Sequence, residues 1–472
     1  MKGLLRVFLS FLTLGCVGIG WNAVCSAQPV AEPDLIVTAA PVYEPLAALE
    51  GKERFPQGAQ LLRIHQGKAA PLIPGFYATA DAQVSFKGDA VLFAARPTAA
   101  DPWQIWEMPL NQGAPRKLFA SPSDAIRPLY LPSGQFVFAL RTAGGFQLEV
   151  AGKGTAEPMA RIDDDAASTL LQLSHVPGNA IPADVLHDGR ILFESVFPLG
   201  VGTKPEMYLV YSDGSGVESY RCDHGVARWG GHQLRSGDVL FTHGSSLARF
   251  TSSQAHELPV AAPQAVYAGG IVEAPSGAWL MSARAAGSKH FVLRSWKPGA
   301  PATALRTVLA LADRDVVEPA VVVDRTRPNH HPTGLHPWNY ANQLALDVRI
   351  SRDGNLAQLP TQVRLETLDM QGRAVAAGSA PIEPDGSFFV QTPADRAIRF
   401  VLLDAKGGVV RREKGWFWIR AGEQRICVGC HAGPERSPEN RVPEVLQKTT
   451  VPVNLTGVNA ASTPQVETPG GN

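Results

Sequence analysis

The chain has 472 residues, of which 45% are apolar, enough to form the cores of two or three domains. Lys and Arg together number 43, and so do Asp and Glu, so the formal net charge is zero. A chain without net charge has no field that attracts nucleic acid or an anionic membrane surface. We therefore expect neither of these partners.

Residues 1–27 have the pattern of a secretory signal peptide. Lys2 and Arg6 form the charged start, Val7 to Trp21 the apolar segment, and Cys25-Ser26-Ala27 a cleavage site of small residues. We expect the mature chain to begin near Gln28 and to lie in the periplasm or otherwise outside the cytoplasm.

No later segment approaches the roughly 18 consecutive apolar residues of a membrane span, so none is expected after cleavage. A lipid anchor on Cys16 is the disfavoured alternative, because Thr13 stands where an aliphatic residue is usual. Two of the five cysteines, Cys16 and Cys25, leave with the signal peptide, and three remain. An odd number in an oxidising compartment argues against a simple disulfide framework and favours a site.

A repeated strand pattern begins near residue 59. Each copy has a turn with Gly, a short alternating apolar strand, a loop and a second strand. The turn glycines are Gly88, Gly134, Gly189, Gly237 and Gly277, at spacings of 46, 55, 48 and 40 residues. A propeller blade is a four-stranded unit of roughly 40 to 50 residues, and Gly suits its tight turns because positive φ costs other residues energy.

We predict a six-bladed β-propeller over residues 59–338, preceded by an extended Pro- and Ala-rich lead-in over residues 28–58. Five copies are regular, and an irregular sixth at Glu318 to Val323 is expected to close the ring with the strand at residues 60–64. An array of β-sandwiches is the alternative, because short strands with Gly turns occur in both. The copies resemble the repeats of TolB-like six-bladed propellers, a likeness that concerns fold and not function.

A second β unit is expected over residues 339–446, after a Pro- and His-rich crossover. Alternating strands at residues 344–350 and 363–366, and a turn at 384–387 that enters a strand, predict a small antiparallel sandwich. Residues 447–472 lack periodicity and are expected to be disordered. The predicted fold class is thus all-β, a propeller followed by a β-sandwich-like domain.

The segment Cys427-Val428-Gly429-Cys430-His431 has the spacing that attaches a c-type haem. The two thiols add across the vinyl groups, and the imidazole after the second thiol lies beneath the iron as an axial ligand. The attachment takes place outside the cytoplasm, in agreement with the signal peptide. The alternatives are a local disulfide, or half of a zinc site completed by Cys222 and a histidine.

The 41 residues after His431 contain no Met and no His, so a sixth iron ligand must come from an earlier segment or be absent. An open iron position favours small-ligand chemistry over simple electron transfer. Trp416 and Trp418 are the expected apolar walls of the haem site. The candidates for a sixth ligand in the crossover are His330, His331 and His336.

A thiol and three imidazoles gather in one predicted blade. Cys222 and His224 are candidate zinc ligands, whereas His232 and His243 are expected to have structural roles.

Parts of the chain resemble the hydrazine synthase alpha subunit, chiefly its middle domain. The resemblance rests on the segments Arg221 to Gly225, Pro381 to Phe388, Pro393 to Asp395, Trp416 to Trp418 and Cys427 to His431. It implies that His431 can turn away from iron to bind zinc with Cys222, while a Tyr four residues later binds the iron. That position is Glu435 here, so Glu435 is an alternative iron ligand, and His431 itself is the other.

The resemblance implies a redox protein with one haem. The family's second haem domain has no counterpart, so full hydrazine synthesis is not expected. One hypothesis is a haem enzyme that acts at an open iron on a small nitrogen or oxygen species. The second is a periplasmic electron carrier, or a propeller that binds a redox partner protein, without catalysis of its own. A third is a propeller with structural zinc and no haem.

Overall fold

The computed structural model describes residues 33–111, 113–152, 170–196, 204–221, 225–253, 255–351, 356–429 and 440–457. All of them lie in one compact unit that starts at Pro33. Their regular structure is almost entirely strand, which confirms the all-β class. The helical elements among them are the 3-10 turns η1 (Ala47–Glu50) and η2 (Ala302–Ala304) and the short helix α1 (Glu444–Lys448).

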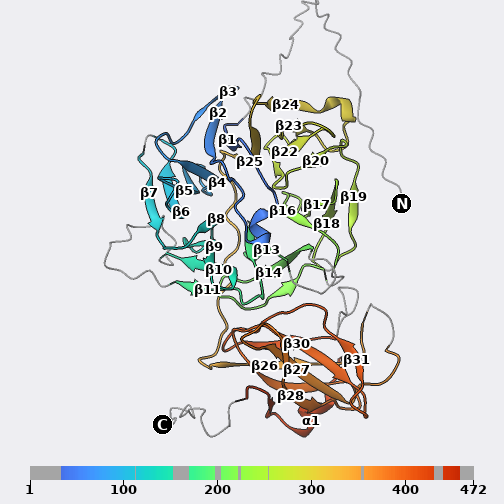
Figure 1. Cartoon of the computed structure of the whole chain (residues 1–472). Coiled ribbons are helices and arrows are strands. Elements are labelled where there is room, and N and C mark those ends of the chain that lie inside the picture. Colours follow the sequence, from blue (N-terminus) through green and yellow to red (C-terminus); the bar gives the residue numbers. More distant parts are fainter. Residues whose placement is uncertain are drawn as a thin grey trace, which may run out of the picture. The chain divides into compact units, whose positions relative to one another are not determined.

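Strands β1 to β25 of the described residues form six antiparallel sheets, which lie around a common centre like the blades of a propeller (Figure 1). The first sheet has the order β25 (Asp315–Val321), β1 (Leu35–Ala40), β2 (Gln60–His65), β3 (Lys68–Pro71). The second contains β4 (Ala78–Val84), β5 (Ala90–Arg96), β6 (Gln104–Pro109) and β7 (Arg116–Phe119). The third contains β8 (Ala125–Tyr130), β9 (Phe136–Thr142), β10 (Gly145–Ala151) and β11 (Leu171–Gln172).

The other three sheets repeat this plan. The fourth contains β12 (Ala180–Val185), β13 (Ile191–Val196), β14 (Pro205–Val210) and β15 (Glu218–Ser219). The fifth contains β16 (Trp229–Gln233), β17 (Val239–His243), β18 (Ser246–Phe250) and β19 (Leu258–Val260). The sixth contains β20 (Val266–Tyr267), β21 (Val272–Glu273), β22 (Trp279–Arg284), β23 (Val292–Trp296) and β24 (Arg306–Leu309).

The five turn glycines that mark the repeat lie at one equivalent place. Four stand in the tight turn between the first two strands of a sheet, and Gly277 stands in the turn between β21 and β22, which pair with each other. Their φ angles are positive, between 72° at Gly88 and 93° at Gly237. Because L side chains rarely adopt this conformation, the glycine spacing located the five turns correctly.

The ring closes through β1, which the sequence analysis did not foresee. Residues 28–58 were expected to be an extended lead-in, but Leu35–Ala40 form a strand buried at every position. A strand buried on both faces shows no alternation, so its pattern resembles an irregular apolar segment. The strand β25 contains the expected closing residue Glu318, but its partner is β1 rather than residues 60–64, and β1 pairs in turn with β2.

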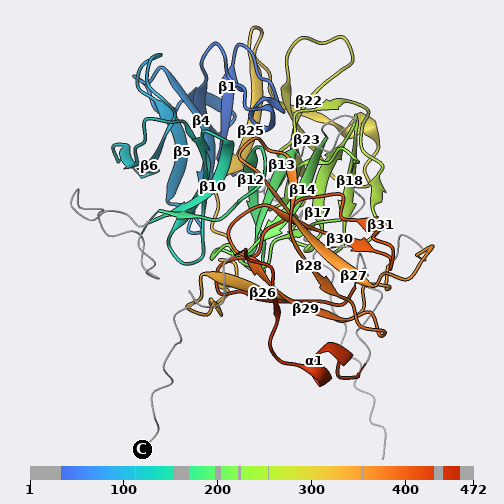
Figure 2. The same cartoon turned by 60° about the horizontal axis from the view of Figure 1, so that its bottom comes forward.

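The C-terminal strands form two further four-stranded sheets that pack face to face (Figure 2). One has the order β32 (Gln424–Cys427), β26 (Tyr340–Ala345), β29 (Phe388–Pro393), β33 (Val453–Asn454). The other has the order β28 (Ala374–Pro381), β27 (Gln362–Leu368), β30 (Ile398–Leu403), β31 (Val409–Arg412). Their shared core includes Val363, Val390 and Ile398, each fully buried.

Three details of this part differ from the predictions. The first sheet is mixed, because β26 pairs β32, and β29 pairs β33, in parallel. The strand expected at residues 344–350 lies earlier, at Tyr340–Ala345. Residues 447–457, expected to be disordered, are ordered, because β33 pairs with β29 and Leu455 is buried; the rest of this segment lies outside the described residues. No helix among the described residues is long and apolar enough to span a membrane.

Candidate functional site

Cys427 is the last residue of β32, an edge strand of its sheet. Its carbonyl accepts a hydrogen bond from the Leu346 amide at 2.9 Å, so the backbone is held up to the attachment motif. Burial raises the pKa of the half-buried Cys427 thiol, while Arg425 opposes this effect. The preceding residue, Ile426, is 64% exposed and, as its neighbour on the strand, points to the opposite face of the sheet from Cys427.

The chain after Cys427 passes close to another loop. A Cβ atom on Gly429 would lie 2.7 Å from the Ile350 carbonyl oxygen and 2.8 Å from that of Asp347. A side chain would not fit there, so glycine at the centre of the motif permits this close approach. The first half of the motif is therefore fixed against residues 347–350.

Several predicted site residues lie outside the described residues. These are Cys430, His431 and Glu435 at the haem motif, and Cys222 and His224 of the predicted zinc site. Within the described ranges, no cluster of three or more His, Cys, Asp or Glu side chains is arranged to hold a metal ion. The zinc prediction thus stays a prediction.

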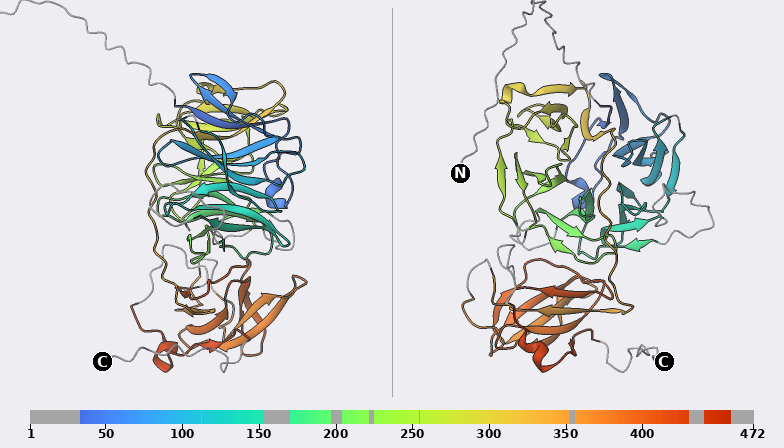
Figure 3. Two further views of the ribbon diagram at one scale, coloured as in Figure 1. Left: turned by 90° about the vertical axis from the view of Figure 1, so that its left-hand side faces the viewer. Right: turned by 180° about the vertical axis from the view of Figure 1, so that it is seen from behind.

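Trp416 and Trp418, the predicted haem walls, pack against the propeller. Both belong to an apolar cluster with residues of β8 to β14. The Trp418 indole donates a hydrogen bond to the Gly214 carbonyl at 3.1 Å and lies 6.1 Å from the ring of Phe193. Arg425, on β32, donates to the Val217 carbonyl. The strand that ends at Cys427 is thereby anchored on the fourth propeller sheet. Figure 3 shows the propeller sheets and the C-terminal sheets from two further sides.

The predicted histidines are separated by the structure. His232 bonds through Nδ1 to Asp184 at 2.9 Å, and His243 to Glu257, as expected of structural histidines. In the crossover, His331 stacks on Tyr211 at 3.9 Å. His336 is the candidate sixth ligand that contacts β32, the strand that leads into the haem motif. Its Nε2 lies 2.9 Å from the side-chain nitrogen of Gln424.

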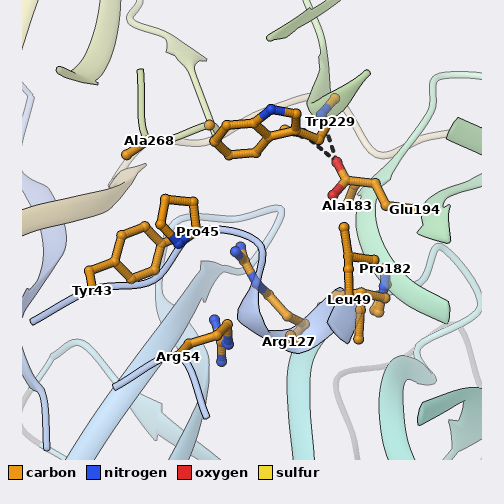
Figure 4. A pocket seen from close by; sticks show the side chains of 16 residues that line it. Tyr43, Pro45, Leu49, Arg54, Arg127, Pro182, Ala183, Glu194, Trp229 and Ala268 are labelled. Atoms are coloured by element: carbon orange, nitrogen blue, oxygen red, sulfur yellow. Dashed lines mark hydrogen bonds between the residues drawn. The ribbon is translucent and has the colours of Figure 1, made fainter. Parts of the chain in front are cut away.

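A second polar centre, absent from the sequence analysis, lies among the inner strands of the propeller (Figure 4). Arg54 bonds both oxygens of Asp81, at 2.6 and 2.7 Å, and bonds Glu318 at 2.9 Å. Arg127 completes the group: its Nε lies 3.3 Å from Oδ1 of Asp81, and its Nη2 lies 3.1 Å from Oε1 of Glu318. The sequence signal for this polar centre is a charged residue inside an otherwise apolar strand, which occurs in three copies of the repeat.

Comparison with known proteins identifies a relative for the segment that contains the haem motif. A family model described as the hydrazine synthase alpha subunit middle domain matches residues 369–432, which include both tryptophans, Cys427, Cys430 and His431. The predicted resemblance to a hydrazine synthase alpha subunit is thereby confirmed. No curated protein matches the chain.

One solved structure agrees with this finding at the level of the fold. Hydrazine synthase from Kuenenia stuttgartiensis has a TM-score of 0.74 at 15% identity, over 88% of this chain and 72% of that chain. TolB from Acinetobacter baumannii has a TM-score of 0.41 at 13% identity, over 62% of this chain and 67% of that chain. The first likeness shows that most of this chain has the fold of the hydrazine synthase chain.

Proposed function

We propose that this hydrazine-synthase-alpha-like chain is an exported redox protein with a six-bladed propeller and one c-type haem, which acts on a small nitrogen or oxygen species. The observation that carries the proposal is the family match across residues 369–432, which runs through the whole motif from Cys427 to His431. The signal-peptide pattern of residues 1–27 supports export, since the attachment requires an extracytoplasmic compartment.

The described residues around Cys427 are compatible with a haem. Cys427 ends an edge strand, and Gly429 permits the motif to pass closely along residues 347–350. Cys427 and Cys430 would hold the group covalently, and His431 or Glu435 would bind the iron. When bound, the haem supplies a redox-active iron whose axial ligands decide between ligand activation and electron transfer.

An electron carrier or partner-binding protein without its own catalysis is the second candidate, and the position of His336 favours it. This side chain contacts Gln424, the first residue of β32, three residues before Cys427. Ligation of the iron by His336 would fill the sixth position and leave no site for a substrate. The alpha-subunit match supports a further protein partner in either case.

Attachment is tested by expression of the full chain with its signal peptide beside a haem-maturation system. We expect denatured protein to keep a haem spectrum and the added mass of one iron porphyrin. Cys427→Ser and Cys430→Ser should each weaken or abolish covalent attachment. Cys222→Ser is the matched control and should keep the haem. Colourless wild-type protein that contains stoichiometric zinc would refute the proposal and support the structural-zinc alternative.

Ligand binding then separates the two candidate functions. An open or weakly held sixth position predicts spectral shifts with carbon monoxide and cyanide, and supports chemistry at the iron. A low-spin spectrum of the wild-type protein that neither ligand changes would instead support electron transfer. The spectrum of His336→Ala should then shift with both ligands, because the sixth position has been opened.

A further inference from the structure

The sixth propeller sheet carries an excess of positive charge. Residues 276–314, which include its strands β22, β23 and β24, contain six Lys or Arg and a single acidic residue, Asp313. The other carboxylate of the sheet, Glu273 on β21, already pairs with Arg235 of the fifth sheet at 3.0 Å. Because the whole chain has no net charge, this sheet creates a local positive field rather than sharing in a general one.

Elsewhere in the ring, arginines are neutralised close to their own sheet. An arginine of each of the first five sheets forms an ion pair with a carboxylate of the same sheet or of its turns, namely Arg63, Arg116, Arg141, Arg190 and Arg249. In the sixth sheet, five cations have no carboxylate of the described residues within ion-pair distance. These five form what we call the basic rim, which consists of Arg284, Lys289, Arg294, Lys297 and Arg314.

Two arginines of the basic rim are held in place by neutral groups. Nη1 of Arg284 donates a hydrogen bond to the Lys289 carbonyl at 3.0 Å, and Nη1 of Arg294 donates to Oγ1 of Thr307 at 2.6 Å. A guanidinium has five N–H donors, so each keeps others for a further acceptor. The rim therefore presents oriented donors whose charge is not balanced within the sheet.

The basic rim extends along the sheet. Lys289 lies in the turn between β22 and β23, Lys297 follows the other end of β23, and both are exposed. A strand of five residues such as β23 is about 16 Å long. Figure 1 shows β24, the next strand, at the outer edge of the ring. Val266, which pairs with Arg284, is 39% exposed and adds an apolar contact, a combination found at protein interfaces.

The chemistry of the basic rim favours a protein over a lipid surface. Trp and Phe side chains commonly enter the headgroup layer of a membrane. The three in residues 276–314, Trp279, Phe291 and Trp296, are at most 5% exposed, so none is available for this contact. The planar guanidinium instead matches a carboxylate, which it can bind through two parallel hydrogen bonds.

We propose that the basic rim is the docking surface for a partner protein that presents a cluster of Asp and Glu side chains. The opposite charges steer the two proteins together and fix the orientation of the complex. This proposal does not rest on the haem chemistry proposed above, because every observation behind it concerns the sixth propeller sheet.

The test uses fluorescently labelled poly-L-glutamate of defined length as the probe, titrated with the mature chain and followed by fluorescence anisotropy. We expect binding that weakens as sodium chloride is raised from about 20 to about 300 mM, because salt screens exposed charges. The double variant Lys289→Glu with Lys297→Glu should weaken binding by about tenfold or more. Labelled poly-L-lysine should not bind to the wild-type rim.

The matched control is Lys68→Glu with Lys117→Glu. It changes the net charge equally, at exposed lysines on the outermost strands of the first and second sheets, and should bind the probe like wild type. Equal weakening by both double variants, or no salt-sensitive binding, would overturn the proposal. So would binding to phosphatidylglycerol vesicles without binding to poly-L-glutamate, or self-association that the rim variant abolishes, since these assign the rim to a membrane or to a second copy. The readout needs no haem, so a failure of haem attachment leaves it unaffected.

Discussion

At the scale of single residues, the propeller centre depends on a buried network that spans the chain. Arg54 is 3% exposed and reaches Glu318, which is 264 residues away in sequence. Thr38 donates to the same carboxylate at 2.9 Å. Such groups are stable only together, because removal of one leaves its partners charged and unpaired.

Arg54→Met should therefore destabilise the protein strongly, by about 3–5 kcal/mol, because Asp81 and Glu318 lose their shared cation. Lys52→Met provides the control from an exposed pair, as Lys52 and Glu50 are 2.7 Å apart with side chains 66% and 52% exposed. That change should leave the stability almost unchanged, because solvent screens an exposed pair. Urea unfolding measures both, and equal costs would contradict the network's role.

Glu149 provides a test of pH dependence. It is 4% exposed, and burial raises its pKa from 4.5 to about 7. Below pH 4.5 the carboxyl is protonated in both the folded and the unfolded state. Between pH 4.5 and 7 the unfolded state loses its proton first, so this residue lowers stability as the pH rises, and above 7 the loss is complete.

Glu149→Gln should remove this loss, on the order of 2 kcal/mol, so the variant gains stability relative to wild type between pH 5 and 8. The free energy of unfolding across that range is the measurement. Glu50→Gln, at an exposed carboxylate, is the control. A constant difference for Glu149→Gln would show that its carboxyl is not buried as described.

At the scale of elements, the segment between β31 and β32 joins the two sets of sheets. Trp418 is 1% exposed and lies in the apolar cluster of the third and fourth propeller sheets. Its neighbour His175 lies between β11 and β12 of the propeller. The Nε2 atom of His175 is 3.7 Å from Oδ1 of Asp395, which belongs to the C-terminal part. Burial lowers the pKa of His175 to about 4, opposed by Asp395, so the contact is built around an uncharged imidazole.

Acid should weaken this contact. Between pH 6.5 and about 4 the unfolded state binds a proton that folded His175 does not, so stability falls as the pH is lowered through this window. His175→Gln should reduce the acid-induced loss by about 2–3 kcal/mol. Chemical unfolding at pH 7 and pH 4.5 tests this, and His187→Gln, at an exposed imidazole, is the control. An unchanged loss in His175→Gln would exclude this histidine as its source.

At the scale of the whole molecule, ring closure depends on β1. This strand pairs with β25 on one side and β2 on the other, so it joins the last propeller strand to the first sheet. Val37 lies at its middle and is fully buried. The strand β3 offers a contrast, because it is exposed and pairs only with β2.

Val37→Pro should destabilise the fold by about 3 kcal/mol or more, since proline removes a ladder hydrogen bond from a central strand. Protease cleavage between the first and second sheets should become faster as the ring opens. Ala69→Pro in β3 makes the same chemical change at an edge and should have a much smaller effect. Similar effects of both would contradict closure through β1.

The sequence by itself determined the features that follow from local rules. Positive φ at the turn glycines and alternation along exposed strands identified the all-β class and five repeats, because both depend on neighbouring residues. The spacing of Cys427, Cys430 and His431 likewise carries the haem prediction without any tertiary information.

Only the tertiary structure decided which distant residues meet. The strand β1 has no alternation because both of its faces are buried, and Trp418 bonds Gly214 across 204 residues. Arg127 and Glu194 face one cavity although neither has a sequence neighbour that indicates it. These contacts arise from ring closure and strand bulges, which bring together residues from six repeats, and no local pattern encodes which charges then converge at the axis.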